Sequence, residues 1–342
     1  MKKQISLLLI LALVVGLLAG CAGTTVVNNY YYYYYGSEEG EKPTEKPEYT
    51  GEGALKTGLA MVASAKTTDA TADANGKVEY TVDLVAVLVD EEGKIADCVI
   101  DSIGATVNFD ITGALTSDVT AAILSKNELG DDYGMVAWGG AKSEWYQQAE
   151  ALAQYCVGKT IDQVLTGYSE DADLATSATI YLGGYVQVIA KAVENAKNLG
   201  AEVGDELILA SQSSLASSAN GAAQLDTDAV AMTMKDGIIT SCYLDAVQAK
   251  VTMDATGVAT VGNMKTKNEL GDDYNMKAWG GAKYEWYEQA ENFCAYVTGK
   301  TPADVAGISV NESTKPADGT DLATTVTIAI AGFQALIAKA AA

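Results

Sequence analysis

Two short segments of this chain carry hydroxyl groups and one carboxylate in the same order. Asp173 to Thr179 read DLATSAT, which fits D-x-x-[S/T]-x-A-T, and Asp321 to Thr327 read DLATTVT, which keeps the Asp and both matching threonines. A hydroxyl serves as a hydrolytic nucleophile when a histidine base removes its proton, and the chain contains no histidine. We therefore do not expect a hydrolase that uses these hydroxyls.

The charge balance excludes one class of partner. The chain has 22 lysines and arginines against 45 aspartates and glutamates, with a formal net charge of −23, and none of the 22 is arginine. Nucleic acids are bound by clustered cations that displace counterions, so we predict no nucleic-acid partner. Zinc would have to be held by cysteines and carboxylates alone, and we predict no metal site.

One stretch of sequence occurs twice, upstream of each hydroxyl segment. Residues 125–160 and 266–301 are identical at 25 of 36 positions. The period is about 145 residues, the length of a whole domain rather than of a solenoid unit. We predict two tandem homologous domains, at residues 51–200 and 201–342.

The N-terminus predicts where the protein lies. Residues 1–20 have a positively charged start and an apolar run, as in a secretory signal. Leu18-Ala19-Gly20-Cys21 resembles the lipobox of bacterial lipoproteins, which implies a diacylated Cys21, membrane lipid as a partner, and an extracytoplasmic protein anchored to the outer face of the cell membrane. Ordinary cleavage beside a chance cysteine is the alternative. Residues 21–50, with six consecutive tyrosines and then acidic, Gly- and Pro-containing sequence, are typical of a flexible tether.

Each repeat begins with strand patterns and ends with helical ones. Runs rich in β-branched residues predict strands, and apolar residues at helical spacing predict helices. The predicted strands are Leu59–Lys66, Val78–Val89, Ile95–Phe109, Glu206–Ser217, Ala229–Met234 and Ile238–Met253. The predicted helices are Glu144–Val157, Tyr185–Ala196 and Phe333–Ala340. Strands followed by helices indicate an α+β fold, in which each domain has an antiparallel sheet backed by helices.

Four cysteines remain after Cys21, two in each repeat. Cys98 and Cys242 are equivalent, whereas Cys294 aligns with Ala153 rather than with Cys156. Residues three apart share a helix face, so one disulfide per domain, Cys98–Cys156 and Cys242–Cys294, is compatible with the pattern outside the cytoplasm. Four buried thiols are equally compatible with it, because free cysteine is among the most buried residue types.

The first hydroxyl segment resembles the attachment motif of the FMN-binding domain family, which includes flavin-carrying subunits of Rnf and of sodium-pumping NADH:quinone reductases. There, a D-x-x-S-G-A-T motif carries FMN on its final threonine through a phosphoester that an FMN transferase installs. Glu128-Leu129-Gly130-Asp131 and the Trp145 to Lys159 stretch are similar to the family's upstream loop and Trp…Gly-Lys stretch. The tandem arrangement is closer still to flavinylated lipoproteins of Gram-positive bacteria that serve extracellular electron transfer.

The resemblance implies a role for each matching residue. Thr179 would bear FMN and Asp173 would be recognised by the transferase. The cofactor-binding candidates are Asp173, Thr176 and Thr179 in the first copy and Asp321, Thr324 and Thr327 in the second. The chain would then hold one or two covalent FMN groups. Thr325 and Val326 replace the two small residues of the family motif. Their β-branched side chains are expected to stiffen the backbone and crowd the phosphate, so we predict lower occupancy at Thr327.

Aromatic and sulfur-containing side chains near the repeat are further candidates. They can pack on the flavin ring or form ordinary core. They are Tyr133, Met135, Trp138 and Trp145, with their copies Tyr274, Met276, Trp279 and Trp286.

The function implied by the resemblance is that of an electron carrier rather than a substrate-specific enzyme. FMN held on threonine would take electrons from a membrane quinol or NADH dehydrogenase and pass them to external acceptors, since a flavin supplies its own redox chemistry. The alternatives are a flavin-free binding or surface-structure lipoprotein that kept the fold, and a substrate-reducing flavoenzyme. Flavin content distinguishes the flavin-free lipoprotein from the electron carrier and from the flavoenzyme.

Overall fold

Each repeat folds into an antiparallel sheet with helices on one face, which confirms the predicted α+β fold. The computed structural model describes residues 49–342, so the predicted signal, Cys21 and most of the tether lie outside the described residues. The first sheet has the order β1-β2-β3 and the second has the order β4-β5-β6-β7. The strands are β1 Lys56–Thr68, β2 Gly76–Val89, β3 Ile95–Phe109, β4 Glu206–Ser214, β5 Ala222–Lys235, β6 Ile238–Met253 and β7 Ala259–Val261.

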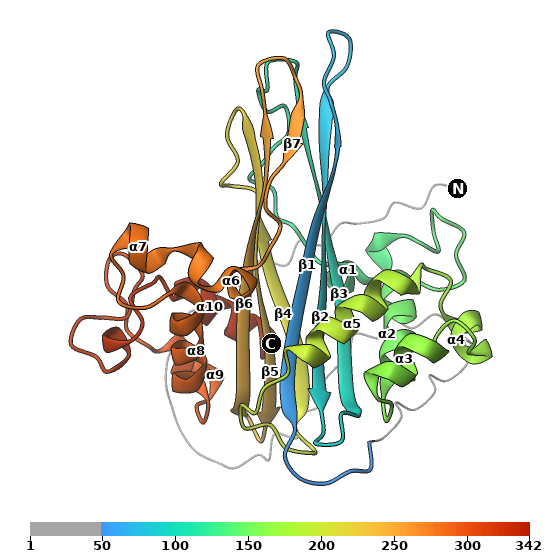
Figure 1. Cartoon of the computed structure of the whole chain (residues 1–342), viewed down its shortest axis with the longest axis vertical. Helices are drawn as coiled ribbons and strands as arrows, with labels where there is room; N and C mark the ends of the chain where they lie inside the picture. Colours follow the sequence, from blue (N-terminus) through green and yellow to red (C-terminus); the bar gives the residue numbers. More distant parts are fainter. Residues whose placement is uncertain (1–48) are drawn as a thin grey trace, which may run out of the picture. The chain divides into compact units, whose positions relative to one another are not determined.

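The long strands change their burial pattern along their length. In β2 and β5, buried and half-buried residues alternate at first and are followed by a continuous buried run, Leu84–Val89 and Ala229–Met234. Alternation is expected where one face of a sheet is covered, and a continuous apolar run where both faces are covered. The ends with alternating burial extend beyond the helices in Figure 1.

The helices follow the strands in both halves. In the first half they are α1 Lys126–Leu129, η1 Gly130–Tyr133, α2 Trp145–Cys156, α3 Ile161–Gly167, α4 Ala172–Ser177 and α5 Leu182–Glu194. In the second half they are α6 Lys267–Leu270, η2 Gly271–Tyr274, α7 Met276–Gly280, α8 Trp286–Val297, α9 Pro302–Ala306, η3 Leu322–Thr324 and α10 Ala331–Ala340. None of these described helices is both long and apolar enough to cross a bilayer.

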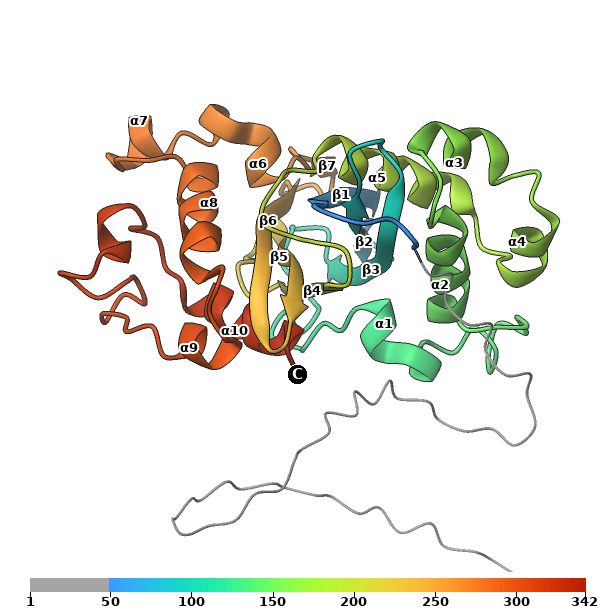
Figure 2. The ribbon, with the colours of Figure 1, turned by 90° about the horizontal axis from the view of Figure 1, so that it is seen from below.

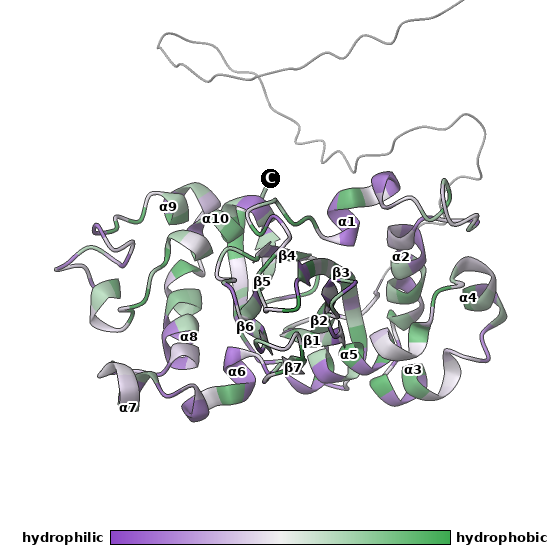
Figure 3. Ribbon diagram, turned by 90° about the horizontal axis from the view of Figure 1, so that it is seen from above, coloured by the Kyte–Doolittle hydropathy of each residue, from purple (hydrophilic) through white to green (hydrophobic). Residues whose placement is uncertain are grey.

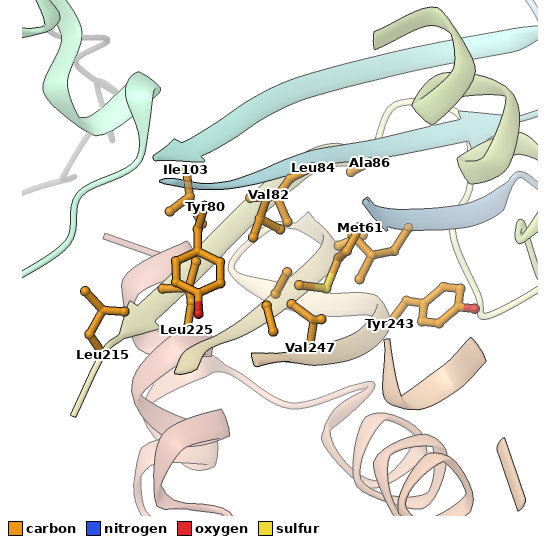
Figure 4. Close-up of a cluster of buried hydrophobic side chains, with 14 of the residues drawn as sticks. Met61, Tyr80, Val82, Leu84, Ala86, Ile103, Leu215, Leu225, Tyr243 and Val247 are labelled. Carbon is orange, nitrogen blue, oxygen red and sulfur yellow. The ribbon is translucent and has the colours of Figure 1, made fainter. Parts of the chain in front are cut away.

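The two sheets pack face to face through a core that both halves supply. Met61 and Tyr80 of the first sheet lie in the same buried cluster as Leu225, Tyr243 and Val247 of the second (Figure 4). The Tyr80 hydroxyl crosses between the sheets and donates a hydrogen bond of 2.9 Å to the Ala223 carbonyl. All described residues belong to one compact unit, Lys46–Ala342.

Helices cover the outer face of each sheet. Helices α2 and α5 pack on β2 and β3 around a second apolar cluster, and α8 and α10 pack on β5 and β6 around a third. Figure 2 shows the resulting order of layers, with helices, two sheets and helices again. Hydrophobic and hydrophilic residues mix along α2, α5 and α10 (Figure 3), as expected for helices with one buried face.

The halves contact each other through equivalent residues. Lys191 of α5 forms an ion pair of 2.6 Å with Glu269, and its counterpart Lys339 of α10 forms one of 2.6 Å with Glu128, the counterpart of Glu269. Reciprocal contacts of this kind are the signature of an isologous, two-fold interface. The chain therefore contains an internal pseudo-dimer of its two repeats.

Candidate functional site

The two proposed attachment threonines occupy the same place in each half. Thr179 lies between α4 and α5, and Thr327 lies between η3 and α10. Both residues are exposed. Both threonines therefore lie at the surface, each in a short connection before a helix.

A buried glutamine holds each threonine, from α2 in the first half and from α8 in the second. The Oε1 atom of Gln148 accepts hydrogen bonds from Thr179 N (2.7 Å), Thr179 Oγ1 (3.1 Å) and Ile180 N (3.0 Å). Its Nε2 atom donates to the Ser143 carbonyl at 2.9 Å, so both ends of the amide are used and its orientation is fixed.

The second half repeats this arrangement atom for atom. Oε1 of Gln289 accepts from Thr327 N (2.7 Å), Thr327 Oγ1 (3.1 Å) and Ile328 N (3.2 Å), and Nε2 donates to the Tyr284 carbonyl (2.9 Å). Sequence reasoning missed both glutamines. The sequence signal that could have found them is a glutamine at the same position in both copies, on the apolar face of the repeated helix.

The residue before each threonine points into the core, so the crowding predicted for the Val326 side chain is wrong, while the lower occupancy at Thr327 stays a prediction. Val326 is fully buried among the apolar side chains beneath the second sheet's helices, and Ala178 is buried in the corresponding cluster of the first half. The exposed hydroxyl and the buried side chain belong to successive residues of an extended segment and face opposite ways. The larger Val326 fills core volume and leaves the approach to Thr327 unaltered.

The other motif residues form a turn of their own. Thr176 Oγ1 and Ser177 Oγ donate to the Asp173 carbonyl at 2.8 and 2.9 Å, and in the second copy Thr324 Oγ1 donates to the Asp321 carbonyl at 2.7 Å. Both aspartates are exposed. The hydroxyls of Thr176 and Thr324 therefore stabilise the turn, and the two carboxylates remain available to an external partner.

The copies differ in what precedes the motif. Asp173 lies in the first turn of an α-helix that Asp171 caps by accepting from Leu174 N at 2.8 Å. In the second copy the turn is a 3₁₀ helix. There, the carbonyl of Thr314, a residue with a φ of 57°, accepts from Ile330 N at 2.8 Å. The segment between α9 and η3 is thus longer than the segment between α3 and α4, and it contacts the residues that follow the second motif.

The aromatic candidates separate into two groups. Trp145 and Trp286 are 2% and 4% exposed and pack edge-on against Tyr185 and Phe333, so they are core. Trp138 and Trp279 are 90% and 88% exposed.

The loop that carries Trp138 is tied to the helix that holds Thr179. The Glu144 carboxylate caps α2 and accepts from Met135 N (2.8 Å) and Val136 N (2.9 Å), and Glu285 does the same at α8 for Met276 N (2.7 Å) and Lys277 N (3.1 Å). Gln148 lies one turn further along α2. The exposed tryptophan and the threonine are therefore both positioned from the first turns of one helix.

A phosphate on either threonine would lie close to the start of a helix. Helix α5, of 13 residues, begins three residues after Thr179, and no side chain caps its N-terminus; α10, of 10 residues, likewise begins without a side-chain cap. Gly183 and Gly184 have no side chains of their own in the first turn of α5, and the Tyr181 ring lies against Gly183. Uncapped N–H groups and the helix dipole favour an anion there, so the residues present fit a phosphoester.

The four cysteines are buried free thiols that meet in pairs. The Cys98 thiol contacts that of Cys156, and the Cys242 thiol contacts that of Cys294. Hydrogen bonding to the partner thiol, together with burial, raises the pKa of Cys98 and of Cys242 well above the usual range. Cys98 and Cys242 are therefore protonated at neutral pH, and the contacts Cys98–Cys156 and Cys242–Cys294 are the pairs that the sequence allowed.

We compared the chain with family models, with curated proteins and with solved structures. None of them matches it. Functional conclusions therefore depend on the motif and on the geometry of the two threonine sites.

Proposed function

We propose that this protein is a lipid-anchored, extracytoplasmic electron carrier that holds FMN on Thr179 and on Thr327. The observation that carries the proposal is the duplicated geometry, in which an exposed threonine hydroxyl is held by a buried glutamine, with an uncapped helix N-terminus following. A structural threonine would require neither the exposure nor the repetition of all three bonds to Gln148 and Gln289. An FMN transferase, a membrane quinol or NADH dehydrogenase and membrane lipid are the proposed partners.

The chain's own residues prepare the threonine for modification. Gln148 Oε1 holds two backbone N–H groups of the loop and the hydroxyl hydrogen of Thr179. Esterification removes that hydrogen and therefore one of the three bonds, while the two backbone bonds keep the loop in place. Bound FMN would supply one- and two-electron chemistry through its own ring.

Exposed aromatic and carboxylate groups have separate proposed roles. Trp138 and Trp279 are the most exposed aromatic candidates for contact with the flavin ring, and Tyr133 is also exposed, whereas Trp145 and Trp286 lie in the core. Asp173 and Asp321 are exposed and are the proposed recognition residues for the transferase. The flavin-free alternative is a surface lipoprotein in which the same turns are purely structural.

Intact mass of the exported protein, produced together with an FMN transferase, tests the proposal. We expect the mass of FMN less one water to be added twice in the wild type and once in Thr179→Ala or Thr327→Ala. The matched control Thr166→Ala replaces a threonine of the same half outside the motif and should keep both groups. Full loading of the Thr179→Ala, Thr327→Ala double variant would reject the assignment, and an unmodified wild type would favour the flavin-free alternative.

Gln148→Leu tests the positioning role separately. The leucine keeps the approximate volume but accepts no hydrogen bond, so we expect incomplete loading at Thr179 with full loading at Thr327. Gln289→Leu should produce the reverse pattern. Equal loading of both threonines in either variant would show that the glutamines are not required.

A further inference from the structure

A groove on the second half gathers lysines in a strongly acidic chain. Its volume is about 280 Å³, and we call it the lysine groove (between β6, β7 and α6 in Figure 1). It is lined by Gln248, Lys250, Thr252, Gly262, Asn263, Lys265, Lys267, Leu270 and Tyr274. Three of these nine side chains are cationic and none is a carboxylate, whereas the whole chain has a net charge of −23.

The positive charge of the groove is not consumed by ion pairs. Within residues 49–342, neither Lys250 nor Lys265 has a carboxylate within salt-bridge distance. Lys267 lies over the rings of Tyr274 and Trp286, at 5.2 and 4.9 Å from their centroids, and lowers the pKa of Asp228 through space, against the larger effect of burial. Lys250 and Lys265 thus leave uncompensated charge at the groove.

The walls of the groove are built by close backbone packing. Gly262 N donates to the Lys250 carbonyl at 2.9 Å, and a side chain at position 262 would place its Cβ 2.7 Å from that oxygen. Glycine therefore lets the segment after β7 run against β6. At the other end, the Tyr274 hydroxyl donates to Gln248 Oε1 at 3.0 Å and ties η2 to the strand.

Within residues 49–200, the first half lacks both this charge and a strand equivalent to β7. Thr106 stands where the second half has Lys250, and Leu124 stands where it has Lys265. Lys126, the counterpart of Lys267, alone is retained and lies over the rings of Tyr133 and Trp145. The single retained lysine serves the aromatic contact found in both halves, and the two additional lysines belong to the groove.

We propose that the lysine groove binds one small multivalent anion per chain, a compound that carries phosphate or carboxylate oxygens. Lysine binds such groups as a point charge with three donors, and the Thr252 hydroxyl, the Asn263 amide and the Tyr274 hydroxyl line the same space. The volume suits a compound of a few heavy-atom groups rather than a polymer. The groove is independent of the threonine sites, so this proposal does not depend on flavin.

Isothermal titration of the described unit with pyrophosphate and with citrate, at constant ionic strength, tests the proposal. We expect at least one probe to bind at one site per chain. The probe that binds more tightly shows whether the groove prefers phosphate or carboxylate compounds. Lys250→Gln with Lys265→Gln should weaken binding about tenfold or more, since both unpaired cations are lost. The control pair Lys66→Gln with Lys142→Gln, two exposed lysines outside the groove, removes the same charge and should weaken binding less than threefold.

Two results would overturn the inference. One is the absence of binding by both probes at millimolar concentration, and the other is equal weakening in the groove and control pairs, which would indicate only a response to net charge.

Discussion

Oxidation of the buried thiol pairs is expected to stabilise the protein substantially. Cys156 and Cys294 lie at positions that are not equivalent in the repeat, yet each meets the equivalent strand cysteine, Cys98 or Cys242. The helix cysteine of the second half thus lies about one helical turn earlier in the repeat than Cys156, and it still contacts the strand cysteine of its own half. We predict one disulfide in each half of the exported protein, Cys98–Cys156 and Cys242–Cys294.

The size of the effect follows from the loops that the bridges close. They span about 58 and 52 residues, and loop-closure entropy gives about 4 kcal/mol each as an upper value, with 2–4 kcal/mol typical of measured bridges. A domain of this size shifts its melting temperature by about 2 °C per kcal/mol. The two bridges together should raise Tm by about 10 °C.

The assay compares one protein in two redox states. Refolding with oxidised glutathione removes two electrons and two protons from each thiol pair and yields two reduced glutathiones per bridge. Peptide mapping without reductant should then show the two expected linkages, and dithiothreitol added after denaturation should abolish the difference in Tm. Refutation would be four alkylatable thiols in the denatured exported protein, or mapped linkages that leave Tm unchanged.

Four further outcomes are expected. Val326→Ala should destabilise the fold by about 2 kcal/mol through a cavity without raising FMN loading at Thr327, as urea denaturation and intact mass will show. Burial raises the pKa of Asp101 and of Asp245 to about 6, so the folded state binds more protons than the unfolded state between about pH 4 and 6, and stability falls as pH rises through that window. In the Asp101→Asn, Asp245→Asn variant the free energy of unfolding should no longer fall over this pH range, a change of at most about 3 kcal/mol per carboxyl. Denaturation curves from pH 4 to 7 will show this. Residues 51–200 alone should form a homodimer by light scattering, because a second copy can cover the exposed sheet face; a stable monomer would contradict the shared core. Thr179→Ala should leave the rate of flavin reduction at Thr327 unchanged in stopped-flow measurements.

The long strands were predictable from the sequence, except for the first half of β5. The predicted bounds of β3 and β6 agree with the structure. For β5 the sequence indicated only Ala229–Met234, because the preceding residues, Ala222–Asp228, alternate with polar side chains and resemble a loop. The short helices α3 and α9 were missed for a related reason, since each buries a single valine, Val164 or Val305, and offers no periodicity.

The candidate site was predictable in its threonines but not in its supports. The family resemblance singled out Thr179 and Thr327, and the structure exposes both residues. The crowding argument at Val326 failed because the direction of a side chain in a short extended segment depends on the helices at either end. Gln148 acts across 31 positions of sequence, and a contact of that range is set by the packing of α2 rather than by any local pattern.

The pseudo-two-fold arrangement also constrains how two attached flavins can work. Thr179 is held from α2 and Thr327 from α8, and these helices cover opposite outer faces of the two sheets (Figure 2). The two sheets and their shared core lie between the helix layers, and successive layers are about 10 Å apart. Under the proposed function, each flavin therefore faces outward and exchanges electrons with partners or with other copies of the chain. Duplication would then give the lipoprotein two independent contact points for electron transfer rather than an internal relay.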